Sequence, residues 1–297
     1  LTTTVMACPC KKLIAPAMNT RMFENPILQD NLEKCRHYGM DIIMPDSGRL
    51  ACGDVGSGKL PSEEVLVAAI LKEIRYEKDM QGLKVLVTAR TSQDAIDPVR
   101  FISNHSTGKM GFALAKTAMQ RGADVTVVAA HTSAKEPLYV NIRRVSSAAD
   151  MFEACKEEAK TADIIIKAAA VADYTPVETA DNKIKKSDDT MAITCKRTQD
   201  ILAYLGAHKP DGQFLCGFSM ETEHMLENSE KKLEKKNLDM IVANNLKVKG
   251  AGFATDTNVV TLITKEEVKE LPLMSKDEVA NEILTQILQR RCPENGQ

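Results

Sequence analysis

The polar residues between positions 97 and 111 have the types and spacing of an anion-binding site. Arg100, Asn104 and Ser106 stand shortly before Gly108, where a helix-like stretch begins. Free backbone N–H groups and the positive dipole end at a helix N-terminus favour phosphate. The segment therefore predicts phosphate binding, although glycine and hydroxyl residues at this place also serve as an ordinary helix cap.

A second polar group lies between positions 167 and 183. The small residues Ala169 and Ala170 would let a ligand lie against the backbone, and the Asp173 carboxylate can accept hydrogen bonds from a base or a sugar. Lys183 follows in a lysine-rich run, which taken alone fits a solvated loop. Together these residues favour a nucleotide site.

A third group begins at the end of another apolar stretch. Phe218 lies there, and Lys232 and Lys236 come after it. Their i, i+4 spacing puts both lysines on one face of a helix. Two positive charges on one face can clamp a polyphosphate, although paired lysines are also common on helix surfaces.

Short apolar segments predict the strands that position these groups. They are residues 84–88, 124–128, 163–166, 214–217 and 239–243. Amphipathic stretches lie between them, including residues 108–121 and a helix that Ser147 can cap. This alternation predicts an α/β fold, a Rossmann-like doubly wound and mainly parallel sheet. Residues 259–263 and 270–273 predict a C-terminal hairpin, and residues 275–289 predict a final helix.

A nicotinamide dinucleotide is the first ligand to consider for such a sheet, and the sequence argues against it. The loop after the first strand contains Arg90, Thr91 and Ser92 where a dinucleotide site needs glycines. The second strand ends in alanines and His131 rather than in an acidic residue for the ribose. An ordinary dehydrogenase is therefore not expected.

The first 76 residues contain less regular structure than an independent α/β domain. A helix is expected over residues 25–37, a strand over 41–44, a glycine-rich loop over 51–60, and a helix that Ser62 caps. One strand is too few for a separate sheet. This region therefore reads as a remnant of a longer domain, joined by a charged linker at residues 77–81 to a second domain over residues 82–297.

The composition fits a soluble globular protein. Hydrophobic residues make up 43% of the chain and charged residues 27%, and the formal net charge of −2 argues against nucleic acid as a partner. No apolar run approaches the roughly 20 residues needed to span a bilayer, and no signal-peptide pattern is present. We therefore expect a cytoplasmic protein without membrane contact.

The eight cysteines are scattered through the chain. Cys8 and Cys10 form the closest pair, and no second pair or histidine pair stands near them to complete a zinc site. No structural metal is expected.

These residues carry a resemblance to a known family. The chain resembles the bacterial bifunctional proteins of coenzyme A biosynthesis, in which phosphopantothenoylcysteine decarboxylase is fused to phosphopantothenate–cysteine ligase. Over residues 82–290 the matching motifs are Asp97-Pro98-Val99-Arg100, Ser103-Asn104-His105-Ser106, Ala169-Ala170-Val171-Ala172-Asp173-Tyr174 and Lys183-Ile184-Lys185-Lys186. The Gly217-Phe218 and Lys232 to Lys236 elements follow in the family's order and spacing.

The resemblance implies a ligase that joins 4'-phosphopantothenate to L-cysteine through an acyl-cytidylate formed from CTP. Lys183 would offset charge at the α-phosphate, and Asn104 and Arg100 would hold the acyl-cytidylate. The residues expected around the cytidine are Ala169, Ala170, Asp173, Gln199, Asp200, Ile201, Leu202 and Phe218. Those expected near phosphates are Ser106, Gly108, Lys232 and Lys236. Mg²⁺ is expected with the triphosphate, without a dedicated carboxylate site in the protein, and the ligase domains are expected to pair as a homodimer.

For the first 76 residues the resemblance implies the C-terminal part of a flavodoxin-like decarboxylase. Asn19 matches its substrate-binding motif, and Cys52 matches its proton-donating cysteine. FMN and a catalytic histidine belong to the N-terminal part of that domain. We therefore expect this half to be inactive and FMN not to bind to it.

Two positions depart from the family's pattern. Arg90 occupies the loop that contains glycine in the family, where a side chain either blocks backbone approach or requires a different φ. Gln199 replaces the family's usual proline. The alternative that follows is a nucleotide-binding or scaffolding fragment of the same protein with impaired catalysis.

Overall fold

The computed structural model describes residues 2–130, 135–185, 190–220, 225–244 and 255–291. Lys186 of the lysine-rich motif lies outside these residues, as does His131. The chain divides into two compact units, Leu1–Glu77 and Lys78–Gln297. Each unit is described below by itself.

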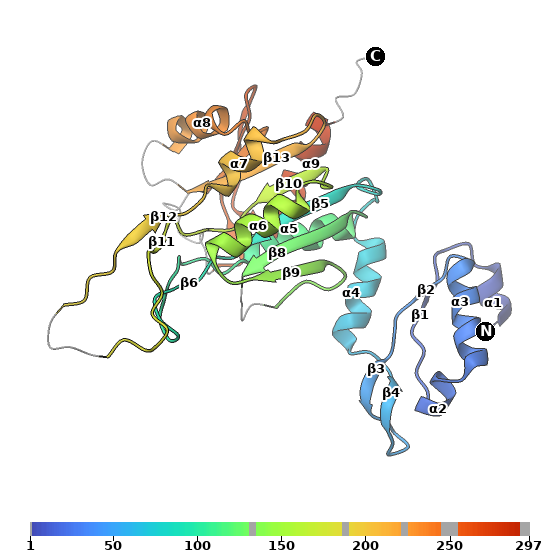
Figure 1. Ribbon diagram of the computed structural model, residues 1–297. Coiled ribbons are helices and arrows are strands. Elements are labelled where there is room, and N and C mark those ends of the chain that lie inside the picture. Colours follow the sequence, from blue (N-terminus) through green and yellow to red (C-terminus); the bar gives the residue numbers. More distant parts are fainter. Residues whose placement is uncertain (1, 131–134, 186–189, 221–224, 245–254, 292–297) are drawn as a thin grey trace, which may run out of the picture. The chain divides into compact units, whose positions relative to one another are not determined.

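The second unit is built on an eight-stranded sheet (Figure 1). Across the sheet the strands stand in the order β17, β16, β14, β13, β10, β5, β8 and β9. Their bounds are β5 Lys84–Ala89, β8 Asp124–Ala130, β9 Asn141–Val145, β10 Ile164–Lys167, β13 Phe214–Met220, β14 Met240–Asn244, β16 Val260–Ile263 and β17 Val268–Glu270. The six strands from β9 to β14 pair in parallel, and β16 and β17 add to the β14 edge in antiparallel fashion.

The strand order reverses between β5 and β10. From β5 the chain goes to β8 and β9 on one side, and then crosses to β10, β13 and β14 on the other. This is the expected doubly wound, mainly parallel sheet. Ligands of such sheets bind outside the carboxyl ends of the strands at this switch point.

Alternating side chains of the sheet pack into two separate apolar cores. In β5, Val85 and Val87 belong to one apolar cluster, and Leu86 belongs to the other. Successive side chains of a strand point to opposite faces, so both faces of the sheet are covered. This explains why the strands read as continuous apolar runs rather than as alternating patterns.

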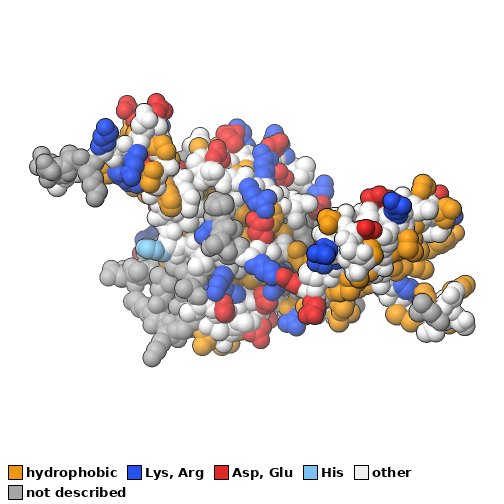
Figure 2. Space-filling model, turned by 90° about the horizontal axis from the view of Figure 1, so that it is seen from below, with side chains coloured by type: hydrophobic (Ala, Val, Ile, Leu, Met, Phe, Trp, Pro, Cys, Tyr) orange, Lys and Arg blue, Asp and Glu red, His pale blue; other side chains and the backbone are white. Residues whose placement is uncertain are grey.

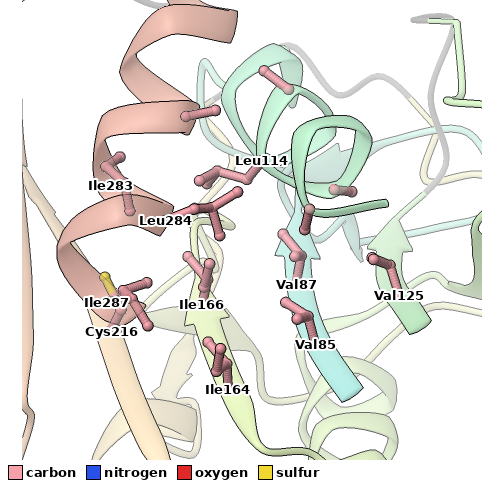
Figure 3. Close-up of a cluster of buried hydrophobic side chains, with 14 of the residues drawn as sticks. Val85, Val87, Leu114, Val125, Ile164, Ile166, Cys216, Ile283, Leu284 and Ile287 are labelled. Carbon is pink, nitrogen blue, oxygen red and sulfur yellow. The ribbon is translucent and has the colours of Figure 1, made fainter. Parts of the chain in front are cut away.

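The helices divide between these two faces. Helices α5 (Lys109–Gln120) and α9 (Lys276–Arg291) cover the Val85 face, where Leu114 meets Ile283 and Leu284 (Figure 3). Helices α6 (Ala148–Glu158), α7 (Ile201–Ala207) and α8 (Met225–Lys235) cover the Leu86 face. Helix α6 begins at Ser147 with the expected cap, since its hydroxyl accepts from the Asp150 N–H and the Asp150 carboxylate accepts from the Ser147 N–H.

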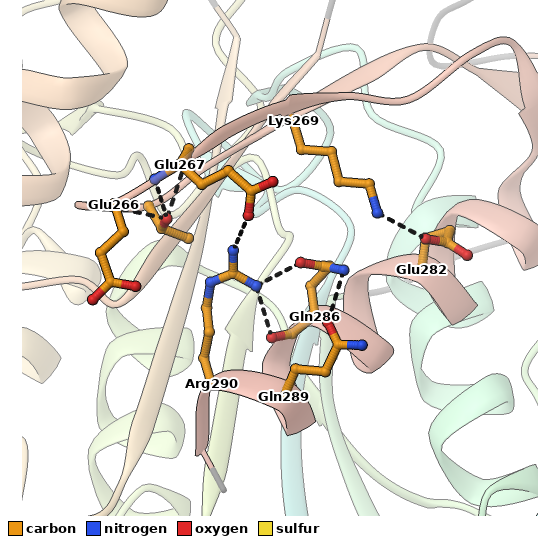
Figure 4. A network of polar contacts seen from close by, with 8 residues as sticks. Glu266, Glu267, Lys269, Glu282, Gln286, Gln289 and Arg290 are labelled. Atoms are coloured by element: carbon orange, nitrogen blue, oxygen red, sulfur yellow. Dashed lines mark hydrogen bonds and ion pairs between the residues drawn. The ribbon is translucent and has the colours of Figure 1, made fainter. Parts of the chain in front are cut away.

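The C-terminal hairpin and final helix are present, with one change of boundary. The second strand of the hairpin is Val268–Glu270, whereas we expected residues 270–273. The turn comes earlier because Thr264 closes it, with its N–H and hydroxyl directed to the Glu267 carbonyl. Arg290 of α9 binds Glu267 at 2.8 Å, which ties the helix to the hairpin (Figure 4).

Shorter strands in the second unit form three two-stranded ribbons. They are β6 Asp94–Ala95 with β7 Phe101–Ile102, β11 Tyr174–Pro176 with β12 Cys195–Arg197, and β15 Thr257–Asn258 with β18 Met274–Ser275. None of these ribbons was expected from the sequence, because two- and three-residue strands produce no periodicity. The β11–β12 ribbon carries the chain away from the main sheet (Figure 1).

The first unit contains more strand than the sequence suggested. It has helices α1 Thr2–Ala7, α2 Thr20–Phe23, α3 Pro26–His37 and α4 Glu63–Ile74, the parallel pair β1 Leu13–Ile14 and β2 Asp41–Ile42, and the antiparallel pair β3 Asp46–Arg49 and β4 Val55–Lys59. The expectation of a single strand was therefore wrong, and half of the expected glycine-rich loop is β4. The expected Ser62 cap is present, since its hydroxyl accepts from the Val65 N–H.

Residues 78–81, expected as part of a linker, pack into the second unit. Met80 is fully buried, Lys78 donates to the Gln120 carbonyl at 2.6 Å, and Asp79 pairs with Arg121.

No helix among the described residues has the length and apolar character needed to cross a bilayer.

Candidate active site

A cavity of about 550 Å³ opens at the carboxyl ends of the central strands of the second unit. It lies at the switch point of the sheet, between the paired strands β5 and β10, from which the chain proceeds in opposite directions across the sheet. It brings together thirteen of the predicted site residues: Asn104, Ser106, Gly108, Ala169, Ala170, Asp173, Gln199, Asp200, Ile201, Leu202, Phe218, Lys232 and Lys236. Three sequence groups that are up to 132 residues apart (from Asn104 to Lys236) thus line one site.

One wall is the N-terminus of α5. Gly108 occupies the N-cap in a left-handed conformation with φ of +77°, which glycine adopts without strain. A Cβ on Gly111 would stand 2.8 Å from the Cβ of Ala89, so its lack of a side chain lets the helix start close to β5. Residues 108–111 at the start of this helix line the cavity, and the positive dipole end of a helix favours an anion there.

The facing wall is the alanine-rich segment after β10. The Ala169 N–H donates to the Thr88 hydroxyl at 3.1 Å, and the Ala172 N–H donates to the Ser92 hydroxyl at 3.2 Å. Asn104 reaches across and donates to the Ala170 carbonyl at 3.2 Å. The end of β5 and the loop after it therefore fix the backbone of this segment, while the Asp173 side chain stays exposed.

The side of the cavity near α7 and α8 carries an ion pair. The Lys236 ammonium lies 2.8 Å from the Asp200 carboxylate, which also accepts from the Ala203 N–H and caps α7. Burial opposes ionisation of Asp200, but these two partners hold its pKa below the usual value. Phe218 of β13 offers an aromatic face nearby, so this part of the cavity combines a ring with fixed charges.

The sequence reasoning gave Lys167 no role, yet this residue lines the cavity. It is the last residue of β10, and its ammonium donates to the Ala169 carbonyl at 2.7 Å. Burial, together with the positive charge of Lys236, lowers its pKa to about 8. Its position as the first polar residue after an apolar parallel strand was a signal that could have identified it.

The end of the cavity opposite α8 was also missed. Asn244 at the end of β14 accepts from the Asn258 amide at 2.9 Å, and both side chains line the cavity. Lys276, which is 7% exposed, lies beside them and donates to the Thr255 carbonyl. Burial, then the nearby charge of Lys109, lowers the pKa of Lys276. Asn258 and Lys276 come from the antiparallel part of the chain, for which the sequence offered no site signal.

Arg90 takes the conformation that its position demands. Its φ is +74°, in the left-handed region that favours glycine, and its carbonyl accepts from the Ala170 N–H at 3.0 Å. The Cβ and Cγ of Arg90 pack against Gly108. The loop after β5 therefore keeps a glycine-like backbone path in spite of the arginine.

Lys183 and Arg100 lie outside this cavity. Lys183 is exposed, and the Arg100 guanidinium donates to the Ile184 carbonyl at 2.8 Å. Asp97 accepts from the N–H groups of Val99, Arg100 and Ile184. Burial opposes ionisation of Asp97, but these N–H donors and the Arg100 charge keep its pKa below the usual value.

Asp97 and Arg100 thus bind both sides of one residue, since the N–H and the carbonyl of Ile184 are both engaged. Lys183 precedes this fixed residue. These contacts join the loop between β6 and β7 to the lysine-rich segment. They fix the backbone of the residue that follows Lys183.

The first unit brings Asn19 and Cys52 together from positions 33 residues apart. The Asn19 amide donates to the Asp54 carboxylate at 3.0 Å and lies 3.5 Å from the Cys52 sulfur. Cys52 in turn lies 3.6 Å from Asp54. A Cβ on Gly58 would stand 2.2 Å from the Met18 carbonyl oxygen, so glycine is needed for β4 to pass beside the Asn19 loop.

No group of three or more His, Cys, Asp or Glu side chains in the described part of the chain could hold a metal ion. Lys, Arg, Asp and Glu side chains are interspersed over the face shown in Figure 2 and do not gather by sign. Within the cavity, the side chains of Lys167, Lys232 and Lys236 supply positive charge.

Comparisons with known proteins match the two units of the chain to two different families. Residues 80–290 match the family described as DNA/pantothenate metabolism flavoprotein C-terminal domain, and residues 1–75 match the family described as Flavoprotein. The chain is 45% identical over 291 residues to the coenzyme A biosynthesis bifunctional protein CoaBC of Bacillus subtilis (strain 168), covering 97% of this chain and 71% of that protein.

Two further matches are similar. The protein of the same name from Vibrio vulnificus (strain YJ016) is 42% identical over 289 residues, which cover 97% of this chain and 72% of that protein. The crystal structure of the C-terminal domain of a CoaBC protein aligns at 43% identity with a TM-score of 0.61, covering 71% of this chain and 96% of that chain.

Proposed function

The chain belongs to the family of bifunctional enzymes of coenzyme A biosynthesis, and we propose that its second unit ligates 4'-phosphopantothenate with L-cysteine using CTP. The products are 4'-phosphopantothenoylcysteine, CMP and pyrophosphate. The observation that carries the proposal is the cavity at the switch point. It is lined by the N-terminus of α5, by the alanine-rich segment, and by Lys232 and Lys236 in and just after α8.

The first step activates the carboxylate. An oxygen of the 4'-phosphopantothenate carboxylate attacks the α-phosphorus of CTP, the bond to the β-phosphate oxygen breaks, and pyrophosphate leaves. Negative charge grows on the α-phosphate and the leaving group, so positioned cations and N–H donors lower the barrier. Lys183 is assigned to the α-phosphate, and Lys232, Lys236 and Ser106 to the phosphates.

The second step forms the amide. The cysteine nitrogen attacks the acyl carbon, the C–O bond of the mixed anhydride breaks, and CMP leaves while the nitrogen loses a proton. Asn104 is assigned to the acyl-cytidylate, because its amide already reaches the Ala170 carbonyl across the mouth of the cavity. Holding the reactants in a productive orientation lowers the barrier, and a well-placed amide fits this role.

Arg100 receives a different role from the one expected from resemblance. Its guanidinium is engaged with the Ile184 carbonyl and Asp97, so we assign it to positioning the Lys183 segment. Asp97, which is 2% exposed, is the second positioning residue. Removal of either should act on the α-phosphate step that Lys183 serves.

The cytidine is assigned to the region between the alanine-rich segment and α7. Asp173, Phe218 and residues 199–202 surround it there, and Asp200 is held ionised by Lys236. Mg²⁺ is expected to arrive with the triphosphate. The described residues offer it no three-carboxylate group, so the phosphate oxygens are its main ligands.

We also propose that the ligase unit acts as a homodimer. Supporting this, Tyr174, Val177, Met191 and Ile193 of the β11–β12 ribbon and its continuation are 54%, 45%, 50% and 36% exposed. Apolar side chains gathered on an extension are typical of an interface. Sedimentation at micromolar concentration tests this, and a monomer would contradict it.

The experiment that tests the function mixes the protein with CTP, Mg²⁺, 4'-phosphopantothenate and cysteine, and measures pyrophosphate. Release that requires 4'-phosphopantothenate supports the proposal, and no release under any condition refutes it. A parallel reaction with ATP tests the choice of nucleotide. Equal rates with both would contradict CTP specificity.

The alternative is a nucleotide-binding fragment with impaired catalysis. The left-handed Arg90 in the loop after β5 favours it, because its side chain lies against Gly108 at the start of α5. Calorimetric CTP binding without pyrophosphate release would support this alternative over the ligase.

For the first unit, we assign Asn19 to binding of 4'-phosphopantothenoylcysteine and Cys52 to proton donation. Asp54 orients both side chains. The expectation that this half neither binds FMN nor decarboxylates stays a prediction. Carbon dioxide release from 4'-phosphopantothenoylcysteine, with and without added FMN, tests it.

A further inference from the structure

Two cysteines in the first unit stand outside every role described above. Cys8 follows α1, and Cys10 lies two residues later, before β1. Their sulfur atoms are 2.9 Å apart, in direct contact. Cys10 is exposed and Cys8 is half-buried, so small molecules in solution can reach the pair.

Chain geometry keeps these sulfurs close. Two residues of fully extended chain span at most about 7 Å, and disulfide-bonded residues have Cα atoms roughly 4.4 to 6.8 Å apart. To form the bond, the two sulfur atoms must close from 2.9 Å to the roughly 2.05 Å of a disulfide. This proximity makes reaction between the two sulfurs intramolecular and favours it over reaction with a second external thiol.

The charges around the pair distinguish the two thiols. Hydrogen bonding with the Cys10 side chain, then with the Cys10 backbone, and the charge of the nearby Lys12 ammonium lower the pKa of Cys8. Lys12 is held there because it donates to the Cys8 carbonyl at 2.6 Å. The same sulfur–sulfur interaction raises the pKa of Cys10. Cys8 is thus the thiol that ionises first, and the thiolate is the nucleophile.

We propose that Cys8 and Cys10 form a redox-active dithiol, which low-molecular-weight disulfides of the glutathione type convert into an intramolecular disulfide. The Cys8 thiolate attacks one sulfur of glutathione disulfide, a Cys8–glutathione bond forms, and one glutathione thiolate leaves. The Cys10 thiolate then attacks the Cys8 sulfur and expels the second glutathione. The protein loses two electrons and two protons, and one glutathione disulfide becomes two glutathione thiols.

The second step becomes easier once the first has occurred. The negative charge that raised the pKa of Cys10 is gone when Cys8 carries glutathione, so Cys10 ionises more readily. Because the bond is exposed to solvent, it belongs to the class of disulfides that thiols reduce readily. Dithiothreitol therefore restores both thiols.

The test is peptide mapping of the full chain after incubation with glutathione disulfide and alkylation of the remaining thiols. Trypsin cleavage after Lys11 gives a peptide of residues 1–11, in which Cys8 and Cys10 are the only cysteines. The expected result is loss of both alkylation sites, with a peptide lighter by two hydrogens and without glutathione. Dithiothreitol added before alkylation should return both sites.

Cys52 is the matched control within the same digest. It is an exposed single thiol in the same unit, alone in the tryptic peptide of residues 50–59. It should carry glutathione or the alkyl group, never a two-hydrogen loss. Cys10→Ser should trap glutathione on Cys8, and Cys8→Ser should react more slowly at Cys10. Glutathione or two alkyl groups on the wild-type 1–11 peptide, to the same extent as on Cys52, would overturn the proposal.

Discussion

The two units of the chain both bring predicted site residues together, but they do so on very different scaffolds. The second unit holds its cavity at the end of an eight-stranded sheet with a buried apolar cluster on each face. Among the described residues of the first unit, the buried apolar side chains include Phe23, Leu32, Ile43 and Ala69, and its strands form two separate pairs. Neither large cluster includes a residue of the first unit.

The difference concerns how a site is held. In the cavity, the side chains of Thr88 and Ser92, at the end of β5 and in the loop after it, fix the alanine-rich backbone. In the first unit Cys52 and Asp54 are exposed and Asn19 is half-buried, and the three residues are held by their own polar contacts. Sites on rigid, packed elements keep their geometry better than sites on loops, so we expect the second unit to carry the measurable chemistry.

Replacing Lys183 should have the largest effect on that chemistry. Lys183→Gln removes the positive charge that we assign to the α-phosphate and keeps a polar side chain that is one atom shorter. Pyrophosphate release should fall by roughly 10²- to 10³-fold, as for other single groups that stabilise transition-state charge. Lys185→Gln is the control, since Lys185 is also an exposed lysine of the same segment. Equal rates for the two variants would contradict the assignment.

One leucine in each unit tests the difference in packing between the two units. Leu114 is fully buried between α5 and α9, and Leu114→Ala should lower the free energy of unfolding by about 2–5 kcal/mol. Leu32→Ala should cost less and leave the amide exchange of β5 and β10 unchanged, because the first unit has little core to lose. Hydrogen exchange read by mass spectrometry reports both units at once. A loss of protection in β5 caused by Leu32→Ala would show that the units do not fold separately.

Asp97 tests whether the Lys183 segment depends on its backbone contacts. Asp97→Asn removes the charge that the Ile184 N–H and Arg100 share, so the rate of pyrophosphate release should fall about 10-fold, on the order of one charge-assisted hydrogen bond. The KM for CTP should change little, because Asp97 does not line the cavity. Asp97→Glu should recover part of the rate. A rise in KM without loss of rate would instead place Asp97 at the nucleotide.

Lys167 gives the smallest effect, and one that depends on pH. Its pKa of about 8 means that the ammonium is charged below that pH and attracts polyphosphate. Bound phosphate favours the charged form, so CTP affinity should be constant below pH 8 and fall as pH rises above it. Lys167→Met should weaken binding a few-fold at pH 7 and remove the decline, since a buried cation then no longer loses its proton. Calorimetry from pH 6.5 to 9.5 measures this.

The sequence predicted most of the parallel sheet because its strands are buried on both faces. Apolar runs such as residues 84–88 and 124–128 coincide with β5 and β8 within one or two residues. The edge strand β9 was missed, since Arg143 and Arg144 interrupt any apolar run there. In the first unit β3 and β4 contain three glycines between them and little apolar character, which explains why they read as a loop.

For the site, the sequence identified residues that follow parallel strands and failed where tertiary contacts decide. Asn104 and Asp173 fell in the cavity because the carboxyl ends of parallel strands share one edge. The engagement of Arg100 with Ile184 could not be foreseen, as it joins residues 84 positions apart through one backbone carbonyl. Lys276 approaches the cavity from the final helix, which no local pattern connects to a nucleotide.

We propose that the second unit makes an acyl-cytidylate and then transfers its acyl group to the nitrogen of cysteine, with CMP as the leaving group. The most direct measurement is the amount of pyrophosphate released per chain with and without cysteine. Without cysteine, the wild-type protein should release no more than one pyrophosphate per site, and only when both CTP and 4'-phosphopantothenate are present.

With cysteine, release should become continuous for the wild type. Asn104→Asp should keep the first release and lose the continuous phase, whereas Lys183→Gln should show neither. Pyrophosphate release that does not need 4'-phosphopantothenate, or wild-type behaviour in both variants, would contradict the account.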